Sequence, residues 1–393
     1  MKEIVVEGEV VSGESNIAVE IKRHWEKLNL PYCDGEVEAE EVIQGDVRDN
    51  EKLFVRGDHE YVKEMAGDHV YGKQSVRREG EDRDILKEEF SKEEVVFVLK
   101  GLKRGKAMGT DLIPNEFLIE AAGDRFIELV RKVMNGIREV ESVPEVWKES
   151  RMVLLHKGGE KRVLDNYRGI AINSNFGKIL TRLIGRRLED DVEVRNLLGW
   201  MQYGFRRKWR STDAIFTVTS IIEKYKREKR RLSVAFLDVR KAYDKVWREG
   251  LWKVLRDLGY GGRVLAIIKD LYTGLTATVD LNGIVSESIS LGAGVRQGCV
   301  LSPLLFDLYV RDLEERLIKE GVGVEIGPAK NIPGMFFADD IVLLAEGGKN
   351  LQRLLDIVGD FGEERKLVFN EKKCMVMINE VESKDNVFVH SFN

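Results

Sequence analysis

Cysteine, proline and long apolar runs are all scarce in this sequence of 393 residues. Its three cysteines lie far apart and form no CxxC pair, so we expect neither a disulfide framework nor a cysteine-based zinc site. No apolar run reaches the roughly 18 residues that a membrane span needs, and the first residues lack a signal peptide. With 43% hydrophobic residues the chain is too apolar to be disordered. We therefore expect a soluble, intracellular globular protein with no membrane partner.

Basic residues are few at the start of the chain and gather later. Residues 1–94 carry 14 Lys and Arg against 26 Asp and Glu, whereas residues 146–231 carry 21 against 10. An acidic leader followed by a basic body suggests a nucleic-acid partner. A solvated helical surface would give the same excess of positive charge, so composition alone leaves both interpretations open.

The pattern of residues predicts an ordered region from about residue 85 to residue 380. Residues 1–84 read as a weakly ordered acidic leader or linker remnant with one amphipathic helix at 19–30, and residues 381–393 as a tail. Ser91 and Glu94 have the spacing of a capping box, which predicts a helix over 92–102. Asn282-Gly283 between two alternating runs predicts a hairpin.

The last two-fifths of the chain alternate strands and helices. Residues 232–238 form a short apolar run that ends in Asp238, and residues 334–346 read as strand, tight turn, strand. A long amphipathic helix over 302–321 separates them. This order of elements predicts an α+β fold.

Three carboxylates stand at the ends of these apolar strands, namely Asp238, Asp339 and Asp340. A charged group at such a position is costly unless it is paired, and Mg²⁺ is a hard ion that prefers carboxylate oxygens. Two Mg²⁺ ions would serve phosphoryl transfer. The alternatives are a plain turn for Asp339-Asp340 and a helix N-cap for Asp238.

Three motifs extend this observation, namely FLDVRKAYDKV (236–246), GVRQGCVLSPLLF (294–306) and FADDIVLLA (337–345). Together they resemble the reverse transcriptases of non-LTR (LINE-type) retrotransposons. The segments upstream and downstream resemble the same family, in the family's order, over roughly residues 90–378. They include GKAMGTDLIPNEFL (105–118), VPEVWKESRMVLLHKGG (143–159), NYRGIAINSNFGKIL (166–180), QYGFRRKWRSTDAI (202–215) and LVFNEKKC (367–374).

The resemblance implies catalytic and metal-binding roles for four residues. Asp238 and Asp339 would hold two Mg²⁺ ions, with Mn²⁺ as a possible substitute, and Asp340 would be the neighbouring carboxylate. Lys373 would assist the pyrophosphate leaving group, although Lys372 beside it fits the motif almost as well.

The resemblance also implies substrate contacts. Tyr243 would be the aromatic gate under the incoming sugar, and the remaining dNTP contacts would be made by Lys157, Arg168, Gln297 and Gly298. The template strand would be touched by Gln202, Gly204, Phe205 and Arg206. As alternatives, Tyr243 is an ordinary buried tyrosine, Lys157 and Arg168 are solvated cations, and Gln297 is a polar loop residue.

The expected protein is therefore an RNA-directed DNA polymerase that binds an RNA template, a DNA primer and dNTP, and adds dNTP to the primer 3′-hydroxyl. The family's right-hand fold predicts fingers over 85–231 and a palm over 232–380, the palm an antiparallel sheet backed by helices. No thumb segment is recognised after the lysine motif, which favours a truncated copy, a gene-model fragment or a domesticated remnant. One alternative is a silent nucleic-acid-binding relic. Another is a two-metal hydrolase, for which no His or Glu cluster is seen.

Overall fold

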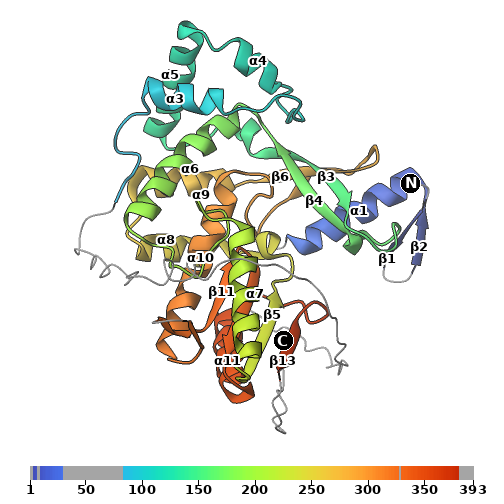
Figure 1. Ribbon diagram of the computed structural model, residues 1–393. Helices are drawn as coiled ribbons and strands as arrows, with labels where there is room; N and C mark the ends of the chain where they lie inside the picture. Colours follow the sequence, from blue (N-terminus) through green and yellow to red (C-terminus); the bar gives the residue numbers. More distant parts are fainter. Residues whose placement is uncertain (1–2, 7–8, 30–82, 327–328, 380–393) are drawn as a thin grey trace. The chain divides into compact units, whose positions relative to one another are not determined.

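The computed structural model describes residues 3–6, 9–29, 83–326 and 329–379. These residues belong to two compact units that alternate along the chain (Figure 1). Of the described residues, unit 1 takes 3–6, 9–29, 83–195 and 243–309, and unit 2 takes 196–242, 310–326 and 329–379. The described part of the chain is a mixture of helices and sheets, as predicted. No helix within it is both long and apolar enough to span a bilayer.

Unit 1 opens with a small hairpin and a helix. Strands β1 (Glu3–Val6) and β2 (Glu9–Ser12) pair antiparallel, and α1 (Glu14–Leu28) follows. Ile17, Ile21 and Trp25 are buried at four-residue spacing, so one face of α1 is apolar and packed. The helix predicted at 19–30 overlaps α1, and the β1–β2 hairpin also falls within the predicted leader. Residues 30–82 of that leader lie outside the described residues.

The main sheet of unit 1 combines local and long-range pairing. Strand β3 (Glu149–His156) pairs antiparallel with β4 (Tyr167–Asn173) and parallel with β6 (Thr276–Leu281). Strand β6 then pairs with β7 (Ile284–Val285) and with β8 (Ile289–Ser290). The predicted hairpin at Asn282-Gly283 is confirmed, because both turn residues have a positive φ, as a two-residue hairpin requires.

Unit 1 also contains a series of helices. The predicted capping box is present at the start of α3 (Lys92–Lys100), where the Ser91 hydroxyl accepts from the Glu94 N–H and the Glu94 carboxylate accepts from the Ser91 N–H. Helix α3 contacts α5 and α6. The other helices are α4 (Asn115–Glu120), α5 (Asp124–Val140), α6 (Gly177–Val194), α8 (Arg248–Asp257) and α9 (Gly262–Tyr272), with short 3₁₀ segments at Glu145–Trp147 and Leu164–Asn166.

Unit 2 is built on a four-stranded antiparallel sheet. Its strand order is β11 (Gly334–Phe337), β12 (Asp340–Ala345), β5 (Leu232–Asp238) and β13 (Met375–Asn379). The first five residues of β5 include four that are fully buried or nearly so, which explains why its sequence is a continuous apolar run rather than an alternating one. The predicted strand, turn, strand over 334–346 corresponds to β11 and β12.

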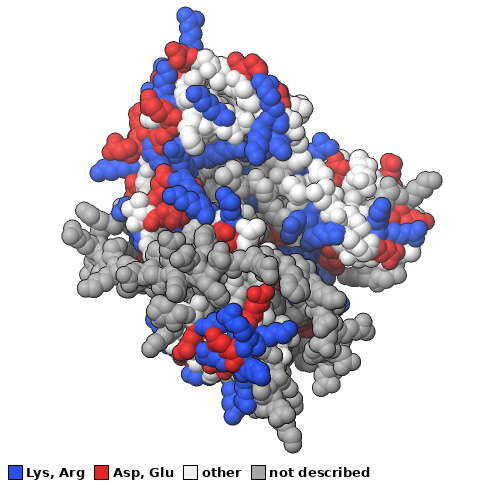
Figure 2. Space-filling model, viewed as in Figure 1, with Lys and Arg blue, Asp and Glu red and all other residues white. Residues whose placement is uncertain are grey.

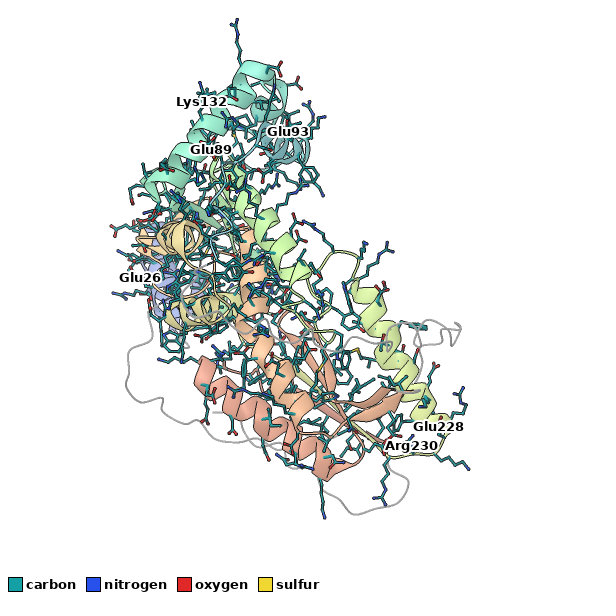
Figure 3. All side chains as sticks on the ribbon, turned by 90° about the vertical axis from the view of Figure 1, so that its left-hand side faces the viewer. Glu26, Glu89, Glu93, Lys132, Glu228 and Arg230 are labelled. Atoms are coloured by element: carbon teal, nitrogen blue, oxygen red, sulfur yellow. The ribbon has the colours of Figure 1, made fainter. Side chains whose placement is uncertain are left out.

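Helices α7 (Ser211–Arg227) and α11 (Gly348–Arg365) contact this sheet, and β9 (Val324–Ile326) and β10 (Ala329–Ile332) form a separate small hairpin. Helix α10 (Leu301–Lys319) belongs to unit 1 up to Tyr309 and to unit 2 from Val310. Beyond the end of α7, Arg230 forms ion pairs with Glu228, Glu325 and Glu346. Arg230 and Glu228 are labelled in Figure 3.

Candidate active site

The two apolar strands of unit 2 bring the acidic residues together. Asp238 is the last residue of β5 and Asp340 the first of β12, and the two are direct cross-strand partners. Opposed residues in an antiparallel pair point to the same face with Cβ atoms about 5 Å apart. Asp339 lies in the two-residue turn that joins β11 to β12. The structure therefore gathers the three predicted carboxylates at one edge of the sheet, where the central strand β5 ends and the central strand β12 begins.

The electrostatics of this edge are those of an anionic cluster. The surrounding protein raises the pKa of the Asp340 carboxyl by partly desolvating it, although the residue is exposed, and the negative charges of Asp339 and Asp238 raise it further. Like charges held this close disfavour one another's ionised form. A cation at this edge would relieve the repulsion.

Lys373 already supplies one positive charge. Its ammonium Nζ lies 3.0 Å from Asp238 Oδ1 and 3.2 Å from Oδ2. The turn that carries Lys373 is fixed to the end of β5, because the Asn370 N–H donates to the Asp238 carbonyl and the Lys373 N–H donates to the Asn370 carbonyl. Lys373 is thus the lysine of the adjacent pair whose ammonium contacts Asp238, a candidate metal ligand.

The carboxylates suit a divalent cation of the Mg²⁺ type. The described residues contain no ready-made group of three or more His, Cys, Asp or Glu ligands. Mg²⁺, however, is commonly held by one or two carboxylates, with waters and substrate phosphates completing its six ligands. Asp238 with Asp339 or Asp340 provides that number of oxygen donors on one edge, so the residues present fit the ion that the sequence predicts.

The residues predicted to contact dNTP belong to unit 1. Tyr243 sits in the short 3₁₀ helix Ala242–Lys245, and its ring stacks on Phe306 with centroids 5.2 Å apart and planes 21° apart. The Gln297 Nε2 donates to Asp244 Oδ1 at 2.5 Å, and the Val295 N–H donates to the Tyr243 carbonyl at 2.7 Å. The loop that carries Gln297 is therefore fastened to the segment that carries Tyr243.

Gly298 joins this loop to β4. It has a φ of +91°, and a Cβ at this position would lie 2.7 Å from the Ala171 carbonyl oxygen, so only glycine fits. Arg168 is on the same strand, opposite Leu155 of β3. Lys157 follows β3, and its N–H donates to the Asn166 carbonyl at 2.8 Å. Both cations are exposed at the surface of unit 1.

A half-buried arginine that sequence reasoning missed holds the same loop. The Arg248 guanidinium donates to the carbonyls of Ala293 and Gly294 at 3.0 and 2.9 Å and to that of Tyr272 at 2.9 Å. Burial lowers the pKa of Arg248 to about 10. Nothing in the local sequence sets this arginine apart from its neighbours, because its three acceptors come from distant segments.

The residues predicted to touch the template lie in unit 2 next to β11. Gln202 is buried, Gly204 follows it, and the Tyr203 N–H donates to the Phe336 carbonyl at 2.8 Å. Phe205 is 55% exposed, and its ring centroid lies 6.4 Å from that of Phe337. The Arg206 guanidinium donates to the Gly199 carbonyl and lies over the Trp209 ring. Contact of these residues with a template remains a prediction.

Basic side chains are abundant on the face of the molecule shown in Figure 2, where acidic side chains are interspersed among them. The segment 146–231 contributes to both units, since unit 1 ends at residue 195 in this part of the chain. The excess of positive charge read from the sequence is therefore divided between the two units.

Comparison with known proteins identifies a family. Residues 155–387 match the family model described as reverse transcriptase (RNA-dependent DNA polymerase). The RNA-directed DNA polymerase from mobile element jockey of Drosophila melanogaster is 27% identical over 72% of this chain and 31% of that protein. The Pol polyprotein from type-1 retrotransposable element R2 of Popillia japonica is 30% identical over 73% of this chain and 39% of that protein.

A probable RNA-directed DNA polymerase from transposon BS of Drosophila melanogaster is 30% identical over 56% of this chain and 24% of that protein. This chain thus spans well under half the length of these three relatives. A solved structure of apo telomerase from Candida Tropicalis, truncated from its C-terminal domain, aligns with a TM-score of 0.45 at 11% identity, over 71% of this chain and 59% of that one. The family model covers more than half of the residues, and the chain accordingly belongs to the reverse transcriptase family, which confirms its resemblance to the enzymes of non-LTR retrotransposons.

Proposed function

We propose that this chain is an RNA-directed DNA polymerase domain that transfers dNTP to a primer 3′-hydroxyl on an RNA template. One observation carries the proposal: Asp238 and Asp340 face each other across β5 and β12, with Asp339 in the adjoining turn. Membership of the reverse transcriptase family supports it independently. Because RNA and dNTP meet inside cells, we also propose that the protein acts there.

Asp238 and Asp339 would hold two Mg²⁺ ions, or Mn²⁺ in their place, with Asp340 as the neighbouring carboxylate. Such a pair of ions would supply charge stabilisation for the attacking hydroxyl and the leaving oxygen of an in-line phosphoryl transfer. The contribution of the protein is to keep the carboxylates aligned, which β5 and β12 do through their register. Lys373 is within reach of the same edge, which supports its proposed role of neutralising or protonating the pyrophosphate leaving group.

For the nucleotide, we propose that Lys157 and Arg168 bind the triphosphate, as a point charge and a bidentate fork. Tyr243 would act as the sugar gate, because a ring that is stacked on Phe306 cannot easily move away from a 2′-hydroxyl. Gln297 and Gly298 would lie beside the nucleotide and template bases. Their loop is held in place by Asp244 and Arg248, which favours a preformed site.

For the template, the exposed ring of Phe205 is the best placed of the four predicted contacts. It has a φ of +52°, a conformation that costs energy for a bulky residue and is concentrated at functional sites. Stacking of an unpaired base on this ring, with Arg206, Gln202 and Gly204 nearby, would hold single-stranded RNA.

In the terms used for right-hand polymerases, we propose that residues 85–231 form the fingers and residues 232–380 the palm.

Primer extension tests the proposal. The full chain is incubated with an RNA template, a labelled DNA primer, Mg²⁺ and the four dNTPs. Products longer than the primer that require both the RNA and the dNTPs support a polymerase. Binding of the template–primer duplex with no extended product, under conditions where the protein is folded, would favour the silent nucleic-acid-binding relic instead.

A further inference from the structure

The turn that carries Asp339 depends on a residue far from it in the sequence. Ala338 is the first residue of the two-residue turn between β11 and β12, and it has a φ of +56°. Residues other than glycine are disfavoured in this left-handed region. Ala338 is also buried, so its N–H needs an acceptor inside the protein.

Gln202 provides that acceptor. Its side-chain oxygen Oε1 accepts from the Ala338 N–H at 3.1 Å and from the Gly204 N–H at 2.7 Å. The residue is only 3% exposed. Its other amide atom, Nε2, is buried and finds no hydrogen-bond partner among the described residues. Of the two polar atoms of the amide, the oxygen is therefore the one that forms hydrogen bonds.

The segment around Gln202 is itself held firmly. The Phe336 N–H donates to the Met201 carbonyl at 2.7 Å, and the Tyr203 N–H donates back to Phe336. The Met201 N–H donates to the buried carboxylate of Glu314, which lies in the part of α10 that belongs to unit 2. A chain of hydrogen bonds, made by the Glu314 carboxylate, the backbone of residues 201–203 and the Gln202 amide oxygen, thus runs from α10 to the turn.

Gly204 fits closely against the same turn. A Cβ at this position would lie 2.4 Å from the Ala338 nitrogen and 3.0 Å from Gln202 Oε1. Any side chain here would push on the hydrogen bond that fixes the turn. Both observations concern the Ala338 nitrogen: the Gln202 oxygen accepts its hydrogen, and Gly204 leaves room for that hydrogen bond.

We propose that Gln202 is a positioning residue whose amide oxygen fixes the Ala338 turn and thereby the direction in which Asp339 presents its carboxylate. This proposal rests on the proposed function, because it assumes that Asp339 holds a metal ion. It differs from the template contact predicted for Gln202, since the oxygen is already engaged by two backbone N–H groups. Residues that orient metal ligands commonly change metal affinity or activity by 10- to 100-fold when they are replaced.

The test compares three variants with one matched control. Gln202→Met has a similar volume and no acceptor, Gln202→Glu keeps an oxygen at the same reach, and Gly204→Ala presses on the turn. Gln352→Met on α11 is the control, since the Gln352 amide nitrogen donates to the carboxylate of the exposed Asp356 at 2.8 Å. Mn²⁺ affinity is measured by electron paramagnetic resonance, and kcat and KM by single-nucleotide extension.

We expect Gln202→Met and Gly204→Ala to weaken Mn²⁺ binding and lower kcat by about 10-fold or more, with the KM for template–primer changed less than about twofold. Gln202→Glu should recover most of both losses, and Gln352→Met should match the parent. If Gln202→Met does not fold, Gly204→Ala gives the same two readouts.

Two results would overturn the proposal. One is a raised KM for template–primer with Mn²⁺ affinity and kcat unchanged, which would assign Gln202 to the template. The other is a Gln202→Glu variant as impaired as Gln202→Met in a folded protein. If no variant and not even the parent extends a primer, the proposed function fails, while the Mn²⁺ affinities still decide whether Gln202 positions Asp339.

Discussion

Single residues carry the chemistry of this protein, and their surroundings explain what each can do. Lys373 contacts both oxygens of Asp238, whereas Tyr243 is held by a stacked Phe306. The sequence predicted the identity of these residues through its motifs. It could not predict Gln202 at the Ala338 N–H or Arg248 on three carbonyls, because those contacts join segments that are far apart in the chain.

Replacing Tyr243 by Val should relax discrimination against rNTP, because the ring that would meet a 2′-hydroxyl is removed. Single-nucleotide addition with paired dNTP and rNTP substrates measures the ratio of kcat/KM. We expect this ratio to fall by about 10-fold or more, within the range that steric contacts provide. A variant as selective as the parent would show that Tyr243 is a packing residue.

The two neighbouring lysines offer a matched pair. Lys373→Ala should lower the rate of nucleotide addition by about 100-fold, the lower range for loss of a positioned proton donor. Lys372→Ala should leave the rate within about twofold, since the structure places the Lys373 ammonium on Asp238. Single-turnover extension measures both. A larger loss in Lys372→Ala than in Lys373→Ala would transfer the role to Lys372.

At the scale of elements, neighbouring residues in the sequence were enough to predict the structure wherever a turn or a helix cap determines it. The capping box at Ser91, the Asn282-Gly283 hairpin and the strand, turn, strand over 334–346 were all predicted from neighbouring residues. The parallel pairing of β3 with β6 was not, since it joins residues more than 120 positions apart. Such pairing is set by tertiary packing rather than by local preference.

Two Gly→Ala substitutions in unit 1 should have opposite effects on stability. Gly283 in the β6–β7 turn has a φ of +91°, so alanine should lower the free energy of unfolding by about 1 kcal/mol. Gly136 lies inside α5 with open space around its Cα, so alanine should raise it by up to about 1 kcal/mol. Urea unfolding measures both. The same sign for both variants would contradict the described backbone.

At the scale of the whole molecule, the chain passes between its two units several times. The carboxylates and Lys373 belong to unit 2, whereas Tyr243, Gln297 and the two cations Lys157 and Arg168 belong to unit 1. The sequence predicted a division at residue 231 into fingers and palm, and that division remains a prediction. Compact units that exchange segments in this way cannot be read from a linear pattern of motifs.

Binding of the template–primer duplex should weaken as salt rises, because cations of both units would neutralise phosphates and release counterions. Between 50 and 200 mM salt we expect a loss of roughly 10-fold or more, which corresponds to at least two neutralised phosphates. Fluorescence anisotropy with a labelled RNA–DNA hybrid measures it. An affinity that is the same at both salt concentrations would contradict a charge-based interface.

The measurement that tests the central claim most directly is extension by a chain that lacks one carboxylate of the β5–β12 edge. Asp339→Asn should abolish RNA-templated nucleotide addition while the unfolding transition stays close to that of the parent, because a like charge is removed from the cluster. Asp356→Asn, on the exposed side of α11, is the matched control and should extend primers as the parent does. Extension by Asp339→Asn at the parent's rate would contradict the account, since the activity would not come from these carboxylates.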